Sequence, residues 1–434
     1  MSSLDRILTA YADADYGDKL TALRREHSMT EYLKNNGETA ARVREIVREV
    51  GERGDEALCE YTARFDNITL SPQELRISPS ALKHAHESLS PELLSTLRRS
   101  IENVRRYQSE IFVGGGSKDG KVKYSHLRRV GLCIPGASAP LPSTVIMTAV
   151  PAIVAGVEQI VVISPPRFEG SIHPVILGLC HELGIKEVYR IGGAQAVAAL
   201  AWGTGTIGKV DKIVGPGNDY VQLAKKEVFG LVDMDSFAGP SDVLVMAGPE
   251  ARADWIAADM LSQAEHNPGA GIVVTASEEF AAEVLAEVKK QCAMLSRAQE
   301  TADCLVKYSA IVVVRDEQAV IDFANDFAAE HLEVQFGARS EAIAKQIRNA
   351  GAIFIGPYSP VATGDYFAGP SHTLPTRQSS KYFSPLSSND FVKSSSIIHY
   401  SQEMLADAAE DIIRLAEVEG LTAHARSVSI RLEE

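Results

Sequence analysis

Residues 242–277 read DVLVMAGPEARADWIAADMLSQAEHNPGAGIVVTAS, and this stretch decides the fold. An apolar run rich in valine stands near each end, and small residues close each run. The segment between the runs, ADWIAADMLSQAEH, has the length and the apolar spacing of a helix. A strand, a helix and a second strand in this order form a βαβ unit with parallel strands. The stretch therefore predicts a parallel sheet that is covered by helices.

The same pattern recurs along the chain. Further apolar runs stand at IVVIS (160–164), VYRIGG (188–193), KIVGPGN (212–218), AIVVVRD (310–316) and AIFIG (352–356). Such runs are apolar on both faces, as strands buried in a parallel sheet are. Because more than five of them alternate with helical patterns, two sheets are expected. The predicted fold class is α/β, with two doubly wound, Rossmann-like α/β/α domains plus small helical N- and C-terminal segments.

Changes of texture along the chain set the expected domain limits. We expect an N-terminal helical segment at 1–25, a first, discontinuous α/β domain at 26–129 and 242–378, a second, incomplete Rossmann-like α/β domain at 130–241, and a C-terminal helical segment at 379–434. Ser90-Pro91 marks the start of a helix. GGGSKDG (114–120) leads into KVKYS rather than into a helix, so it predicts a hairpin or loop.

Composition argues against several classes of function. The net charge is −14, from 43 basic and 57 acidic residues, so nucleic acid is repelled on average. No long apolar run predicts a membrane span, and the first residues lack the apolar core of a signal peptide. Five scattered cysteines without CxxC spacing predict reduced thiols in a cytoplasmic protein. Any metal site must therefore use nitrogen and oxygen ligands.

Four segments in the second half of the chain carry residues that bind metal ions or move protons. They are LSQAEH (261–266), AAEHLEV (328–334), TGDYFAGPSH (363–372) and EGLTAH (419–424), which together offer Gln263, His266, Glu330, His331, Asp365, His372, Glu419 and His424. Histidine and carboxylate side chains hold divalent cations and act as general acids and bases near neutral pH. This density of such side chains predicts an enzyme.

The local setting of these residues differs from segment to segment. Gln263 and His266 stand three apart near the end of a predicted helix, so they share a face. The Glu330-His331 pair is expected at the end of another helix. Asp365 and His372 are expected in one glycine-rich loop after AIFIG, where catalytic groups are frequent. For the last pair, at 419 and 424, helix capping and solvation are an equally fair interpretation. Spacing alone predicts a metalloenzyme without naming a substrate.

Two glycine-rich segments predict a second functional region. GGAQ (192–195) and GPGN (215–218) each follow a predicted strand. Ligands of open α/β sheets bind at the carboxyl ends of strands, so both segments are well placed for a cofactor or a substrate. Neither is a GxGxxG fingerprint and neither is a Walker motif. By themselves, both are also compatible with plain tight turns.

Taken together, these segments resemble the histidinol dehydrogenase family. The resemblance also rests on VGLCIPGASAPLPSTVIM (130–147), IGGAQAVAALAWGT (191–204), VDKIVGPGNDYV (210–221) and AGPSDVLV (238–245). It extends from RGDEAL at 53–58 to SVSIRL near the end of the chain. Such long motifs in a fixed order are jointly specific for one family.

This resemblance implies an oxidoreductase that uses zinc and NAD. Such an enzyme converts L-histidinol to L-histidine, the last steps of histidine biosynthesis, in two successive hydride transfers through a bound aldehyde. Carried over residue by residue, one zinc ion per subunit would be held by Gln263, His266, Asp365 and His424. His331 would be the general base of the alcohol step, and Glu330 would activate the water that attacks the aldehyde.

The resemblance also assigns binding residues and a partner. Ser241, His372 and Glu419 would contact the substrate, as would the four metal ligands and the two catalytic residues. Cys133, Gln195 and Asn218 would contact NAD. Cys133 stands where many family members have tyrosine, and Ala137 replaces a glycine of the same stretch. The segment with Glu419 and His424 would reach the partner's active site, so a homodimer with composite sites is expected.

Three other functions remain open from the sequence. The first is a relative with the same scaffold that oxidises another small alcohol, such as a sulfonated diol. The second is a zinc hydrolase with nitrogen and oxygen ligands, in which zinc-bound water is the nucleophile. The third is a catalytically silent metal-binding protein. Glu330 and His331 would serve no purpose in the third, and tight NAD binding would separate the first from the second.

Overall fold

A computed structural model describes residues 4–114, 120–136, 140–266 and 268–433. The chain divides into two compact units, each described here by itself. The first unit contains residues 1–112 and 126–392, and the second contains residues 113–125 and 393–434. In the described part of the chain, no helix combines the length and the hydropathy that a membrane span requires.

The larger sheet of the first unit, sheet A, is built by parallel pairing. In the described residues it contains six strands in the order β1-β10-β9-β8-β11-β12. Counted from β8, the last five follow the 3-2-1-4-5 order of a doubly wound fold. Their bounds are Leu8–Ala10 (β1), Ser241–Ala247 (β8), Gly269–Thr275 (β9), Ala310–Val313 (β10), His331–Gln335 (β11) and Ala352–Ile355 (β12).

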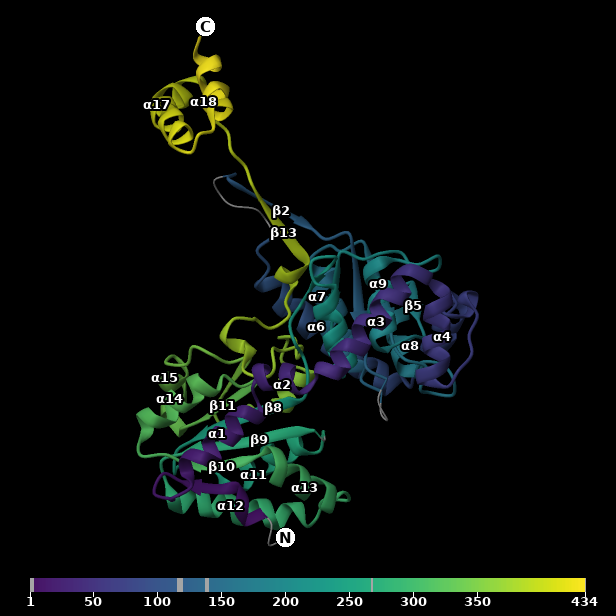
Figure 1. Cartoon of the computed structure of the whole chain (residues 1–434). Helices are drawn as coiled ribbons and strands as arrows, with labels where there is room; N and C mark the ends of the chain where they lie inside the picture. The colour runs from purple at the N-terminus through teal and green to yellow at the C-terminus, as the bar shows by residue number, and fades with distance from the viewer. Residues whose placement is uncertain (1–3, 115–119, 137–139, 267, 434) are drawn as a thin grey trace. The chain divides into compact units, whose positions relative to one another are not determined.

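Helices cover both faces of sheet A, as Figure 1 shows in green around β8 to β11. One face packs against α11 (Ala253–Ala264), α12 (Glu278–Cys292) and α13 (Ala298–Tyr308). The other face packs against α1 (Tyr16–Glu26), α14 (Glu317–Phe327) and α15 (Ser340–Ala344). The short helix α16 (Val361–Tyr366) follows β12. Because both faces of the sheet are buried, apolar side chains project from both. The strands therefore appear in the sequence as continuous apolar runs rather than as alternating patterns.

The second sheet of the first unit, sheet B, has the same winding. Its order in the described residues is β5-β4-β3-β6-β7, again 3-2-1-4-5 when counted from β3. Its strands are Arg129–Cys133 (β3), Gln159–Ile163 (β4), Glu187–Tyr189 (β5), Lys212–Val214 (β6) and Asp233–Met234 (β7). Two doubly wound parallel sheets confirm the predicted α/β fold class.

Helices also cover both faces of sheet B. One face packs against α3 (Gly37–Arg53), α4 (Asp55–Asp66), α9 (Gly193–Trp202) and α10 (Asp219–Val228). The other face packs against α5 (Pro79–Glu87), α6 (Pro91–Glu110), α7 (Pro142–Val154) and α8 (Pro174–Glu182). Helix α2 (Met29–Asn35) precedes α3. The predicted helix start at Ser90-Pro91 is confirmed, because the Ser90 hydroxyl group accepts the Leu93 N–H.

Two expected assignments differ from this packing. We expected residues 26–129 to share a domain with 242–378, but α3 to α6 contribute to the cores of sheet B. The apolar stripe of an amphipathic helix predicts that the helix packs against a sheet. It does not predict which of the two sheets, because the stripe is compatible with either. The N-terminal segment was expected to be helical, yet it adds strand β1 to the edge of sheet A. The remaining domain limits stay predictions.

The second unit is small and mostly helical. It contains α17 (Gln402–Val418) and α18 (Thr422–Ser429), which pack together (Figure 1, yellow). It also contains most of the paired strands β2 (Val122–His126) and β13 (Val392–Ser396). The loop expected at 114–120 lies largely outside the described residues.

Candidate functional site

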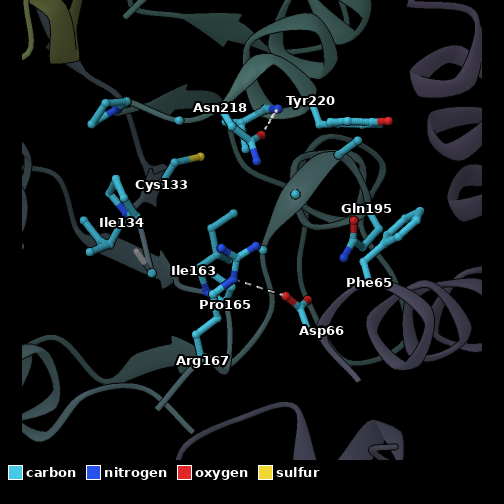
Figure 2. Close-up of a pocket in the computed structure, with 18 of the residues that line it drawn as sticks. Phe65, Asp66, Cys133, Ile134, Ile163, Pro165, Arg167, Gln195, Asn218 and Tyr220 are labelled. Atoms are coloured by element: carbon cyan, nitrogen blue, oxygen red, sulfur yellow. Dashed lines mark hydrogen bonds and ion pairs between the residues drawn. The ribbon is translucent and has the colours of Figure 1, made fainter. Parts of the chain in front are cut away.

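A cavity of about 540 Å³ opens at the carboxyl edge of sheet B (Figure 2). The ends of β3 and β4 and the turns after β5 and β6 line it, at the point where the strand order reverses. This is where doubly wound sheets bind their ligands. The lining residues include Phe65, Asp66, Cys133, Ile163, Pro165, Arg167, Gly192, Gly193, Gln195, Gly217, Asn218, Tyr220, Ala238 and Gly239.

Both glycine-rich segments singled out in the sequence lie at this cavity. In GGAQ, Gly193 opens α9 with a φ of 69°, and Gln195 is buried with an Oε1 atom that has no hydrogen-bond partner among the described residues. In GPGN, Asn218 caps α10 by accepting the Val221 N–H at 3.2 Å. Both segments follow strands, as expected, and both border this cavity.

A buried ion pair that the sequence did not reveal holds the GPGN turn in shape. Lys225 is fully buried, and its Nζ atom donates to the Asp235 carboxylate and to the carbonyl oxygens of Gly215 (3.0 Å) and Ser236 (3.1 Å). Asp235 accepts in turn from the Gly215 N–H at 2.6 Å. The turn is thus fixed by side chains ten and twenty positions away.

Cys133, at the end of β3, contributes a neutral thiol to the cavity wall. The side chain is buried, and burial raises its pKa to about 12. Arg167 reaches across the cavity wall toward Asp66, with 3.7 Å between Nε and Oδ1 (Figure 2). Ala137, the second departure from the family pattern near Cys133, lies outside the described residues.

A second cluster of predicted site residues lies at the amino ends of the strands of sheet A. Ser241 begins β8, and His331 begins β11 directly after Glu330. The Gln263 side chain, on α11, donates to the Ser241 hydroxyl oxygen. The Glu330 and His331 side chains are almost completely buried. Predicted site residues far apart in sequence therefore meet at one point.

Hydrogen bonds orient both members of the Glu330-His331 pair. Oε2 of Glu330 accepts the backbone N–H of Asp242 at 3.0 Å. Nδ1 of His331 lies 2.9 Å from the Asp242 carbonyl oxygen, which fixes the proton on Nδ1. Nε2 of His331 has no hydrogen-bond partner among the described residues and lies 3.8 Å from Oδ1 of Asp365. The imidazole therefore presents one free nitrogen atom toward Asp365.

The charges of the cluster are strongly coupled. Burial raises the pKa of Glu330 to about 8. Burial lowers the pKa of His331, but the Glu330 and Asp365 carboxylates raise it to about 9. Burial raises the pKa of Asp365, yet His331, His372 and His266 together hold it below its usual value. The raised pKa of Glu330 brings its titration closer to neutral pH, which suits proton transfer.

A second cavity, of about 640 Å³, adjoins this cluster. It is lined by His331, Asp365 and His372 together with residues of α6 and of the segment 384–387. Nδ1 of His372 lies 3.2 Å from the Asp365 carbonyl oxygen, and its Nε2 lies 3.4 Å from the Thr144 hydroxyl group of α7. Burial lowers the pKa of His372.

Three local expectations about these residues were wrong. Glu330 and His331 do not end a helix: α14 stops at Phe327, and His331 opens a strand. His266 does not share a helical face with Gln263, because α11 stops at Ala264 and leaves His266 exposed. Asp365 lies in helix α16 rather than in a loop, although His372 does follow in irregular chain. In each case tertiary packing decided where the local element ends.

The expected metal ligands are divided between the two units of the chain. No group of three or more His, Cys, Asp or Glu side chains is arranged to hold a metal ion among the described residues. Of the expected ligands, Gln263, His266 and Asp365 lie in the first unit. His424 lies in α18 of the second unit, and Glu419 caps the end of α17. Both are exposed.

Comparisons with known proteins agree on one family. Residues 30–432 match the sequence profile of histidinol dehydrogenase. A histidinol dehydrogenase of Rhodopirellula baltica is 46% identical over 397 residues, which cover 90% of this chain and 86% of the relative. One from Bacillus subtilis is 47% identical over 400 residues, covering 90% and 92%. The crystal structure of histidinol dehydrogenase from Elizabethkingia anophelis superposes with a TM-score of 0.88 at 32% identity and covers 98% of both chains.

These matches extend over nearly the whole chain, and they include the segments that form both clusters. The profile match begins before α3 and ends beyond α18. The sequence identities exceed 40% in both relatives, and the solved structure has the same fold throughout. The chain therefore is an enzyme of the histidinol dehydrogenase family.

Proposed function

We propose that this enzyme oxidises L-histidinol to L-histidine with zinc and NAD, in two hydride transfers through a bound aldehyde. The net reaction consumes one water molecule and reduces two NAD molecules per histidinol. The observation that supports it is the buried Glu330-His331 pair, held by hydrogen bonds beside a cavity and next to Asp365. An alcohol-to-acid oxidation needs a base for the hydroxyl proton and a group that activates water. The pair supplies both.

His331 has the geometry of the base for the alcohol step. Its Nδ1 proton is committed to the Asp242 carbonyl oxygen, so Nε2 is the atom that accepts a proton. Glu330 then serves the aldehyde step by taking a proton from the attacking water. Because burial raises the pKa of Glu330 to about 8, its carboxyl group exchanges protons readily near neutral pH.

The residues of the cluster fit a zinc ion. The proposed ligands, Gln263, His266, Asp365 and His424, offer only nitrogen and oxygen atoms, and the chain's five cysteines are free thiols elsewhere. When bound, zinc supplies a positive charge that holds the nitrogen atoms of the substrate. Engaging Asp365 as a ligand would also weaken its hold on His331 and lower the pKa of that base.

The cavity at sheet B fits a dinucleotide. It lies at the switch point of a 3-2-1-4-5 sheet, and the N-terminal turns of α9 and α10 border it. Gln195 offers an unpartnered buried acceptor there, and Asn218 lies at the start of α10. NAD would supply the hydride acceptor. Cys133 would contact it through a neutral thiol.

We further propose a homodimer in which the second unit completes the partner's site. Glu419 and His424 are exposed, so they are free to act on another subunit. The same unit exposes large apolar side chains, which need a partner surface. They include Ile398 (82%), Tyr400 (50%), Met404 (52%), Leu415 (66%) and Val418 (82%). The free thiols of the chain support a cytoplasmic enzyme.

The stoichiometry of NADH formation tests the proposal. Purified, zinc-loaded protein is given limiting L-histidinol with excess NAD, and NADH and the product are measured. Two NADH per histidinol, with L-histidine as product, is the expected result. One NADH per substrate would contradict the second oxidation. No turnover by a dimer that binds both zinc and NAD would contradict histidinol as the substrate, and other small alcohols would then be assayed.

A further inference from the structure

Asp242 links the two proposed catalytic residues, although no function is assigned to it above. It follows Ser241 in β8 and is 3% exposed. Its backbone N–H donates to Oε2 of Glu330, and its carbonyl oxygen meets Nδ1 of His331. In addition, its carboxylate accepts the backbone N–H of Glu330 at 2.8 Å. One residue thus contacts Glu330 twice and His331 once.

The carboxylate of Asp242 accepts a backbone N–H that lies just outside the β8–β11 ladder. The β8–β11 ladder begins with His331 opposite Val243, so the Glu330 N–H lies before the first paired residue. On the other side, the Glu330 carbonyl oxygen accepts the Ala352 N–H at 2.9 Å. With the Asp242 carboxylate on its N–H, both backbone polar groups of Glu330 are held. A buried N–H without an acceptor would carry the full cost of its desolvation.

We propose that Asp242 is a positioning residue that clamps the backbone and the carboxylate of Glu330, and thereby sets the rate of the aldehyde step. This inference rests on the proposed function, in which Glu330 serves that step. The side chain of Asp242 hydrogen-bonds to Glu330, whereas His331 is held by the backbone carbonyl oxygen of residue 242, which every substitution keeps. Loss of the side chain should therefore affect the two half-reactions unequally.

The test compares the two half-reactions in side-chain variants of the zinc-loaded enzyme. Alcohol oxidation is measured with L-histidinol, and aldehyde oxidation with the aldehyde supplied directly. In Asp242→Ala we expect the ratio of aldehyde to alcohol kcat to fall about tenfold, the effect of losing one buried hydrogen bond. KM for NAD should stay unchanged, because Asp242 does not line the cavity at sheet B. Asp242→Asn keeps an oxygen acceptor, so it should restore most of the ratio.

Ser340→Ala is the matched control. Its hydroxyl group accepts the backbone N–H of Phe336 at 2.9 Å, just past the opposite end of β11, and it is also buried. Removing it deletes the same kind of hydrogen bond from the same strand, far from the catalytic pair. We expect a loss of stability without a change in the half-reaction ratio. Asp242→Ser, whose side chain is too short to reach Glu330, repeats the test if Asp242→Ala does not fold.

The outcomes separate the two ideas. A selective loss in Asp242→Ala or Asp242→Ser, with recovery in Asp242→Asn and an unchanged ratio in Ser340→Ala, supports the inference. Equal loss of both half-reactions, or an equal change in Ser340→Ala, overturns it and leaves only a structural role for Asp242. Absence of histidinol oxidation by the unaltered enzyme would instead overturn the proposed function, and this inference with it.

Discussion

Two carboxyl groups, the fully buried Glu333 and the half-buried Asp259, hydrogen-bond to each other near the proposed catalytic residues. Asp259 lies on α11, one turn before Gln263, and Glu333 lies on β11, two residues after His331. Oε1 of Glu333 also accepts the N–H of Val361, at the start of α16. The pair therefore ties together three elements that carry site residues. We predict that it makes stability fall as pH rises.

The size of the effect follows from the pKa of Glu333. Burial, assisted by the Asp259 carboxyl group, raises this pKa from 4.5 to about 8. Between these values the folded protein binds more protons than the unfolded chain, so the free energy of unfolding decreases with pH. The contribution of the protonated group is complete below pH 4.5 and is lost as pH approaches 8. At about 1.4 kcal/mol per pKa unit, the loss amounts to about 5 kcal/mol.

Asp259→Asn is the sharpest perturbation of this pair. The amide group would donate to Glu333, which already accepts from Gln335 and Val361. An ionised Glu333 would then have three donors and no neighbouring acid, so its pKa should fall. From pH 5 to pH 8.5 the free energy of unfolding should fall less in the variant than in the wild type. We expect this difference to reach at least about 2 kcal/mol, a little under half of the pH-dependent loss.

The assay is urea unfolding at constant ionic strength, followed by tryptophan fluorescence from pH 5 to pH 8.5. The chain has two tryptophans. Trp255 lies on α11 with Asp259, and Trp202 is the last residue of α9, a helix of the sheet B layer. A Trp202→Phe background leaves one reporter on the helix under test. Asp254→Asn, an exposed acid on the same helix paired with Arg252, is the control and should leave the slope unchanged.

Parallel stability profiles would refute this reasoning. If Asp259→Asn and the wild type keep a constant difference from pH 5 to pH 8.5, Glu333 does not titrate in that range. A slope that Asp254→Asn removes equally would place its origin in surface charge instead. Either result would mean that the pair is ionised or is hydrated in the folded protein.

Further predictions concern the proposed site and the cavity at sheet B. His331→Asn should slow histidinol oxidation by roughly 10²–10⁴-fold, as loss of a positioned base does, and steady-state NADH formation measures it. Glu330→Gln should slow aldehyde oxidation more than alcohol oxidation; equal damage would contradict the division of roles. His424→Ala should reduce the zinc that copurifies with the dimer, and an unchanged metal content would remove His424 from the ligand set. Lys225→Met should leave Asp235 buried without its partner, cost about 3–5 kcal/mol and weaken NAD binding by calorimetry; wild-type values for both would contradict the account of the GPGN turn.

The sequence predicts the α/β class because parallel strands buried on both faces leave apolar runs. It does not predict β11, whose letters are HLEVQ. His331, Glu333 and Gln335 stand on one face of that strand and are all buried. Nδ1 of His331 and the carboxyl group of Glu333 find hydrogen-bond partners in Asp242 and Asp259, which lie on other elements. A strand whose buried face is polar lacks the apolar run by which buried strands are recognised. Its sequence was therefore interpreted as the end of a helix.

The supporting residues of the site escaped sequence reasoning for the same reason. Asp242 and Glu330 are 88 positions apart, so no local spacing connects them. Lys225 and Asp235 are closer, but a lysine and an aspartate at that distance are usually both exposed. One sequence feature could have drawn attention to Asp242: it is an acidic residue, directly after Ser241, at the start of an otherwise apolar strand. Family resemblance assigned the groups proposed to act in catalysis, whereas only the packing reveals what orients them.

The polarity of the two sheets explains how both clusters can serve one reaction. The cavity proposed for the dinucleotide lies at the carboxyl edge of sheet B, and the proposed catalytic pair lies at the amino edge of sheet A. Helix α7 follows β3 from that carboxyl edge, and its Thr144 contacts His372 of the catalytic cluster. The connection from β7 to β8 first lines the cavity at Ala238 and Gly239 and then places Ser241 beside Gln263. If the proposed base lay at the carboxyl edge of sheet A instead, the length of that sheet's strands would separate it from the proposed hydride acceptor.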